Sequence, residues 1–241
     1  MNTNIDTPSL HGALAELKLK HEDFFKDTLT PGHLYLDIGS FYASERLRAW
    51  FSLNSDKYLP VRISYETSSK DIFNASPIFL GSIRTNAFLR NFYASPAARK
   101  LAYRLHPEKY SFVTVTKPKE RDIRVLSQLG MEVSDDVGVL TTPRRELTLG
   151  HVTRIPNPGG AGHMTIITSD ATYAVDKMAE TVCSDEHLAE IMRQTGWADD
   201  EPLPDTFEWL FLVRLWPAGN ADEAKKPELL TWRMPPPPDV I

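Results

Sequence analysis

The sequence predicts an α/β protein with a flavodoxin-like or Rossmann-like parallel sheet in its first half, extended by antiparallel strands in its second half. Short apolar strands alternate with helical segments up to residue 116. Connections of roughly ten to twenty residues join these strands, and parallel pairing needs connections of that length. Turn-rich segments separate the later strands, which is typical of hairpins.

The elements of the first half follow from apolar periodicity. Apolar residues recur at helical spacing over residues 13–29, and Leu34, Leu36 and Ile38 alternate as in a strand. A continuous apolar run at residues 77–82 is typical of a strand covered on both faces. The predicted order is a helix over 13–29, a strand over His33–Gly39, a helix over Ser40–Phe51, a strand over Val61–Tyr65, a short turn up to Asn74 and a strand over Pro77–Ser82.

The second half begins with a predicted helix from about Asn86 to Leu105 and a strand over Tyr110–Thr116. Ser184, followed by Asp185 and Glu186, predicts the start of a helix. The remaining predictions are strands over 137–142, 147–155, 164–169, 207–216 and 228–233, and a helix over 172–193 in two pieces. The domain prediction is an N-terminal helical extension over residues 1–30, one α/β domain over 31–233 and a proline-rich tail over 234–241.

Composition narrows the class of protein. Hydrophobic residues make up 41% and charged residues 24%, which is ordinary for a globular chain. The single cysteine, Cys183, excludes an intrachain disulfide, and the histidines form no metal-binding motif, so no metal is predicted. A net charge of −5 argues against general nucleic-acid binding. Neither a secretory signal nor a membrane span is visible, so we expect a cytoplasmic protein that does not enter membranes.

Three strand-to-helix junctions are the candidate binding site. In an open sheet, ligands bind beyond the carboxyl ends of the strands, where helix starts offer free N–H groups. Arg84 adds a cation placed to pair with a phosphate or carboxylate. The predicted ligand-binding residues are Asp37, Gly39, Ser40 and Tyr42 at the first junction, Gly81, Ser82, Arg84, Thr85 and Asn86 at the second, and Ser169, Asp170 and Thr172 at the third.

A purely structural interpretation competes at each junction, because any strand-to-helix turn favours glycine and a capping side chain. No GxGxxG or GxxxxGK[ST] motif occurs at the strand ends, which argues against the common nucleotide-binding loops. No cofactor can be named from the sequence. Carboxylates such as Asp37, Glu45, Glu66 and Asp71 could act as acid and base on a glycosidic bond.

Three further features have both a functional and a structural interpretation. Cys183 lies one turn before His187, a spacing that could activate a thiolate, but a small packed residue is the commoner role of a lone cysteine. The glycine-dense segment 157–163 fits a flap over a site or a plain hairpin loop. The aromatic residues of the closing hairpin fit either the core or an association surface.

Three segments together resemble a bacterial domain of uncharacterised function, which is often fused to helix-turn-helix or winged-helix regulators. They are residues 71–86, residues 150–175 and the closing hairpin. The resemblance covers roughly residues 33–233. Ser169-Asp170-Ala171 departs from it where a glycine is usual, and no DNA-binding module is visible. The resemblance implies a sensor-like or effector-like Rossmann-type domain.

These observations leave three hypotheses. The preferred one is a sensor-like domain that binds a small anionic or nucleotide-derived molecule at the carboxyl edge of the sheet. The second is a nucleosidase or NAD-consuming hydrolase that uses one of the carboxylates. The third is a protein-interaction module that presents the aromatic hairpin. Whether the chain catalyses a reaction stays open, as does association with copies of itself.

Overall fold

The structure is a computed structural model. All of the residues that it describes belong to one compact unit, residues 37–241. They are residues 38–55, 59–60, 72, 75–83, 85–106, 112–129, 132–133, 137–141, 147–157, 162–197, 202–214 and 226–235. The predicted helix over 13–29 and the predicted strand over 61–65 lie outside these residues, as do residues 33–37 of the first predicted strand.

The main sheet has five strands in the order β1-β7-β6-β8-β9. Its members are β1 (Ile78–Ser82), β6 (Leu147–Pro156), β7 (His163–Ser169), β8 (Phe207–Arg214) and β9 (Glu228–Arg233). β1 pairs with β7 in parallel, and the other pairs are antiparallel. The α/β class and the antiparallel second half are therefore confirmed. The described strands form a mixed sheet with one parallel pair rather than a clear Rossmann-like sheet.

The strands between residues 103 and 141 do not join the main sheet but form a second sheet. Its order is β2-β3-β5-β4, all antiparallel, from β2 (Tyr103–Leu105), β3 (Phe112–Thr116), β4 (Glu132–Val133) and β5 (Val137–Thr141). The strand predicted over 110–116 is thus present, but it belongs to this sheet. The long helix predicted over 86–105 is wrong in its second half. α5 (Ala87–Ala94) ends before Pro96, which favours an extended Ser95, and η2 (Ala97–Lys100) leads into β2.

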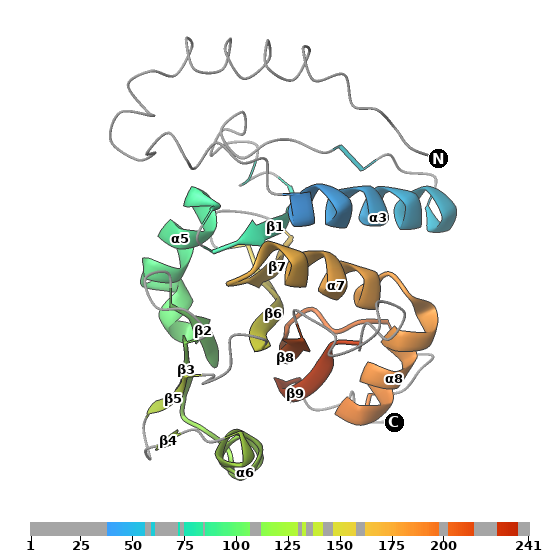
Figure 1. Ribbon diagram of the computed structural model, residues 1–241. Helices are drawn as coiled ribbons and strands as arrows, with labels where there is room; N and C mark the ends of the chain where they lie inside the picture. Colours follow the sequence, from blue (N-terminus) through green and yellow to red (C-terminus); the bar gives the residue numbers. More distant parts are fainter. Residues whose placement is uncertain are drawn as a thin grey trace, which may run out of the picture. The chain divides into compact units, whose positions relative to one another are not determined.

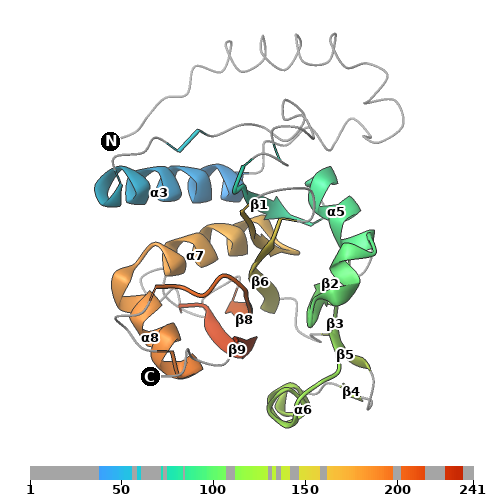
Figure 2. The ribbon, with the colours of Figure 1, turned by 180° about the vertical axis from the view of Figure 1, so that it is seen from behind.

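Helices cover the main sheet. α3 (Ile38–Asn54) and α7 (Thr172–Val182) lie side by side in both views (Figures 1 and 2), and α8 (Asp185–Thr195) follows α7. α3 begins two residues before the predicted start, so Ile38 and Gly39 are helical rather than the end of a strand. Ser184 caps α8 as predicted, because its Oγ accepts a hydrogen bond from the His187 N–H. A further helix, α6 (Glu120–Gln128), lies between β3 and β4 in the sequence.

The core lies on both faces of the main sheet, and β8 shows why its sequence is almost continuously apolar. Leu210 and Leu212 pack with α5 and the second sheet, whereas Trp209, Phe211 and Val213 pack with α3, α7 and α8. Alternate residues of one strand therefore enter two different clusters. Most of the hairpin's described aromatic residues are core residues, which agrees with the first of their two interpretations. In the described part of the chain, no helix is long and apolar enough to cross a membrane.

Candidate functional site

The second and third predicted junctions meet at the carboxyl ends of β1 and β7. Ser82 is opposite Ser169 in the parallel ladder, and the Ile83 N–H donates to the Ser169 carbonyl at 3.1 Å. The Ser82 hydroxyl, itself buried, donates to the Asp170 carbonyl at 3.1 Å. Two segments almost ninety residues apart are thus held together by direct hydrogen bonds. This geometry agrees with the prediction that the second and third junctions lie at one edge of the sheet.

The first junction reaches the same edge through α3. A Cβ placed on Gly39 would lie 1.9 Å from the Thr172 carbonyl oxygen, so only glycine allows this approach of α3 to α7. A Cβ on Gly81, whose φ is 142°, would lie 3.4 Å from the Ser40 Oγ. Gly81 has a backbone conformation that other residues rarely adopt. α3, α5 and α7 therefore begin close together (Figure 1).

The first turns of these helices differ from those of α6 and α8. α3, α5 and α7 carry no acidic residue in the first turn. α6 and α8 each carry two. An acidic first turn interacts favourably with the positive end of the helix dipole. The first turns of these three helices therefore leave the positive ends of their dipoles uncompensated, although Asp170, two residues before α7, brings one carboxylate to this edge.

Several predicted site residues also have structural roles. Asn86 caps α5 by accepting from the Leu89 N–H, and it donates to the Leu80 carbonyl. The Thr85 hydroxyl donates to Ser82, and the Ser169 hydroxyl donates to Leu149. These bonds shape the turns, as the structural interpretation of the junctions predicts.

The other predicted residues differ in how accessible they are. Asp170 is buried at the edge, and Thr172 is half-buried at the start of α7. Tyr42 is exposed and packs edge-on against Phe41. Asp37 and Arg84 lie outside the described residues, so the cation on which the anion hypothesis depends has no described position.

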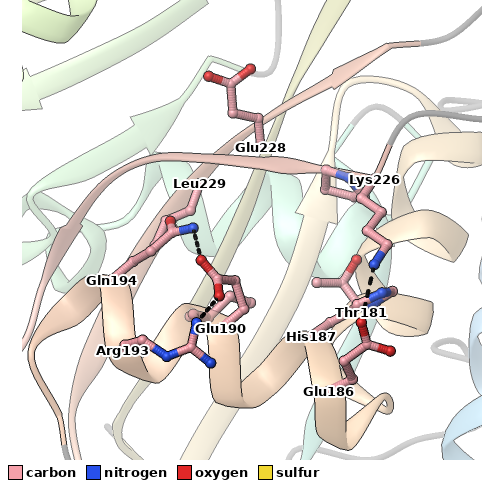
Figure 3. Close-up of a pocket in the computed structure, with 11 residues that line it drawn as sticks. Thr181, Glu186, His187, Glu190, Arg193, Gln194, Lys226, Glu228 and Leu229 are labelled. Carbon is pink, nitrogen blue, oxygen red and sulfur yellow. Dashed lines mark hydrogen bonds and ion pairs between the residues drawn. The ribbon is translucent and has the colours of Figure 1, made fainter.

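The structure also has a pocket that the sequence did not predict (Figure 3). Its volume is about 540 Å³, and it lies between α8 and the start of β9. Glu190 points toward Arg193 and Gln194, and Lys226 extends to Glu186 at 3.7 Å. Each of these ion pairs has both side chains at least half exposed. The pocket rim is therefore a set of solvated surface charges, which contribute little binding energy.

A chain of buried polar side chains lies behind the candidate edge. His151, on the central strand β6, has no exposed surface. Its Nδ1 is 2.7 Å from the Tyr93 hydroxyl, and its Nε2 is 3.6 Å from a carboxylate oxygen of Glu208. Glu208 in turn accepts hydrogen bonds from the Ala102 and Tyr103 N–H groups at 3.0 and 3.1 Å. This series of hydrogen-bonded side chains therefore joins α5, the main sheet and the second sheet.

Asp122 is the centre of a neighbouring buried cluster. Arg233 binds both of its oxygens, and Tyr103 donates to it at 3.0 Å. The hydroxyl of Thr231 and the N–H of Lys119 complete the set. Burial raises the pKa of Asp122, but the hydrogen bonds from Arg233, Thr231 and Lys119 outweigh it and lower that pKa overall. This cluster fixes α6 against β2 and β9.

The sequence did not single out His151, Tyr93 or Glu208. One signal was available for Glu208, since it is an acidic residue within the apolar run of β8. A buried strand carries such a charge only where partners satisfy it. His151 gave no comparable signal, because its partners are distant in sequence.

The alternative chemistries gain little support. Burial raises the pKa of Cys183 to about 11, which is opposite to what an activated thiolate needs. Glu45 is exposed and pairs with Arg48 at 2.9 Å, while Asp37, Glu66 and Asp71 lie outside the described residues. Residues 158–161 of the predicted flap also lie outside them. Among the described side chains, no group of three or more potential ligands could hold a metal ion.

No family model matches the chain, and neither a curated protein nor a solved structure matches it.

Proposed function

We propose that this domain binds a small anionic or nucleotide-derived molecule at the carboxyl ends of β1 and β7. The observation that carries the proposal is the meeting of three helix starts without acidic first turns at one parallel strand pair. Peptide N–H groups at such positions bind phosphate and carboxylate groups. The sequence adds Arg84 between Ser82 and Thr85.

Asp170 refines the chemistry of the proposed ligand. It brings a carboxylate to the same edge, and that negative charge disfavours a bare dianion. A carboxylate accepts hydrogen bonds from hydroxyl groups, such as those of a sugar. A nucleotide, which combines phosphate with sugar hydroxyls, therefore fits the edge better than inorganic phosphate. The resemblance of residues 33–233 to a bacterial domain of uncharacterised function implies a sensor-like role, and that expectation points to the same proposal.

Thermal unfolding with a panel of inorganic phosphate, pyrophosphate, AMP, ATP and NAD tests the proposal. A compound present at 100 times its Kd stabilises the folded state by about 2.7 kcal/mol and raises the melting temperature. We expect a stabilising nucleotide for the wild type, and a loss of that effect in Arg84→Ala. Arg193→Ala, in the pocket beside α8, is the matched control and should retain the effect. Equal stabilisation of the wild type and Arg84→Ala would place the site elsewhere.

The hydrolase remains the alternative from a different class. Incubation of the protein with NAD and with nucleotides distinguishes the two, because only a hydrolase releases the free base. Product that disappears in Glu66→Gln but persists in Glu45→Gln would identify the carboxylate, since Glu45 is already paired with Arg48. Binding without product would favour the sensor. Light scattering at several protein concentrations tests association with copies of the chain.

A further inference from the structure

When the His151 imidazole is neutral, the buried side chains around it have one consistent arrangement of hydrogens. A carboxylate oxygen of Glu208 faces Nε2 at 3.6 Å, so a hydrogen on Nε2 is favoured over a lone pair. Nδ1 is then the acceptor for the Tyr93 hydroxyl at 2.7 Å. Burial, together with the charges of Glu208 and Asp170, raises the pKa of Tyr93 well above its ordinary value. Tyr93 therefore keeps its proton and acts as the donor.

The Glu208 carboxylate has a second role that competes with His151. Its two oxygens accept from consecutive N–H groups, those of Ala102 and Tyr103, where the chain enters β2. The oxygen nearest His151 is the one bound to the Tyr103 N–H. The same atom thus faces a neutral peptide donor on the second sheet and an imidazole on the main sheet.

We propose that His151 is a proton-dependent switch at the joint between the two sheets, and that its protonation draws Glu208 away from β2. A charged N–H donor forms a shorter and stronger hydrogen bond than a neutral one. Imidazolium at Nε2 therefore closes the 3.6 Å gap by drawing this oxygen toward His151. The movement lengthens the hydrogen bond from the Tyr103 N–H, and the attachment of β2 to the main sheet loosens.

Protonation has a second requirement at Nδ1. Once Nδ1 carries a hydrogen, Tyr93 must accept rather than donate, and its own hydrogen has to turn away. Tyr93 therefore opposes protonation, and its removal should favour it. The titratable and charged groups that surround the switch are Tyr93 from α5, Tyr103 from β2, Glu208 from β8, Arg233 from β9, Asp122 from α6 and Asp170 from the turn after β7.

The test follows two nuclear magnetic resonance signals of the wild-type protein between pH 8 and pH 5.5. Imidazole ¹⁵N shifts report the protonation of His151, and hydrogen-exchange protection factors report the Ala102 and Tyr103 amides. We expect the imidazole shifts and the protection factors to change with the same midpoint. The protection factors should fall about tenfold, because the hydrogen bond of each amide to a charged group is weakened. The Leu210 amide, within β8, should keep its protection.

Variants separate the switch from other acid effects. Tyr93→Phe should move the midpoint of the imidazole shifts to higher pH, and His151→Gln should abolish the pH-dependent fall in protection. His163→Gln, which lies outside the buried group of side chains around His151, should leave that fall intact. Constant imidazole shifts and protection factors in the wild type would overturn the proposal. It would also be overturned if the pH-dependent loss persisted in His151→Gln. If His151→Gln does not fold, coincidence of the two wild-type midpoints supports the switch and separation of the midpoints refutes it.

Discussion

The replacement Asp122→Asn tests how strongly the buried cluster stabilises the fold. The side chain of Asp122 has no exposed surface, and that of Arg233 is 16% exposed. Asparagine keeps the shape but removes the negative charge between Arg233 and Tyr103. It also points an amide N–H₂ group toward the guanidinium, so Arg233 remains buried without its counter-ion.

The expected loss is large. Removing one partner of a buried ion pair costs about 3–5 kcal/mol, because the remaining charge is left uncompensated. Asparagine retains one acceptor oxygen for Tyr103 or for the Lys119 N–H, so we expect the lower part of this range, about 3 kcal/mol. At a slope of about 3 kcal/mol per molar urea, the unfolding midpoint should fall by about 1 M.

Urea unfolding, followed by both tryptophan fluorescence and circular dichroism, measures this change. The pH dependence gives a second readout. The pKa of Asp122 is lowered in the folded state, so its charge contributes fully to stability above about pH 5 and that contribution is lost as the pH falls through the folded pKa. Between pH 5 and pH 3, the free energy of unfolding should therefore fall more steeply for the wild type than for Asp122→Asn.

The matched control is Glu45→Gln, which removes a carboxylate from an exposed ion pair. That change should alter the free energy of unfolding by less than about 0.5 kcal/mol. A loss below about 1 kcal/mol for Asp122→Asn at pH 7, or parallel acid profiles for the two proteins, would refute the assigned role of the cluster.

Three other predictions follow from single contacts. Gly39→Ala places a methyl group 1.9 Å from the Thr172 carbonyl oxygen, so thermal unfolding should show a loss of about 2 kcal/mol or more; unchanged stability would mean that α3 and α7 are further apart. Asn86→Ala removes the cap of α5 and should cost about 1 kcal/mol, whereas Asn54→Ala at the end of α3 should cost less. Because the pKa of the Cys183 thiol is raised to about 11, iodoacetamide at pH 7.5 should alkylate the native protein far more slowly than the urea-unfolded protein; equal rates would contradict this burial.

Local patterns predicted much of the second half of the fold. The strands β6 to β9 and the two helices α7 and α8 followed from apolar periodicity and from the Ser184 cap, which act within a few residues. The meeting of the Gly81 and Ser169 segments was also predictable, because strand-to-helix turns of a parallel pair share an edge.

The pairing of distant strands was not predictable in this way. β1 was expected beside strands of the first half, but its described partner is β7, and residues 103–141 form a sheet of their own. Pattern and propensity specify that a strand exists and leave its partner to long-range packing. The same limit applies to His151. Its partners Tyr93 and Glu208 come from α5 and β8, and only the folded chain brings them together.

The parallel pairing of β1 with β7 has a consequence for the order in which the protein forms during synthesis. The ribosome adds residues from the N-terminus, so β1 leaves it more than eighty residues ahead of its partner. The second sheet, whose strands are consecutive, can form in that interval. Among the described strands, β1 has no partner until residue 169 has emerged, and until then its apolar segment Ile78–Leu80 needs protection from other chains. Slow translation between residues 83 and 163 would prolong that wait, and chaperone binding to nascent chains stalled in this interval should concentrate on the β1 segment.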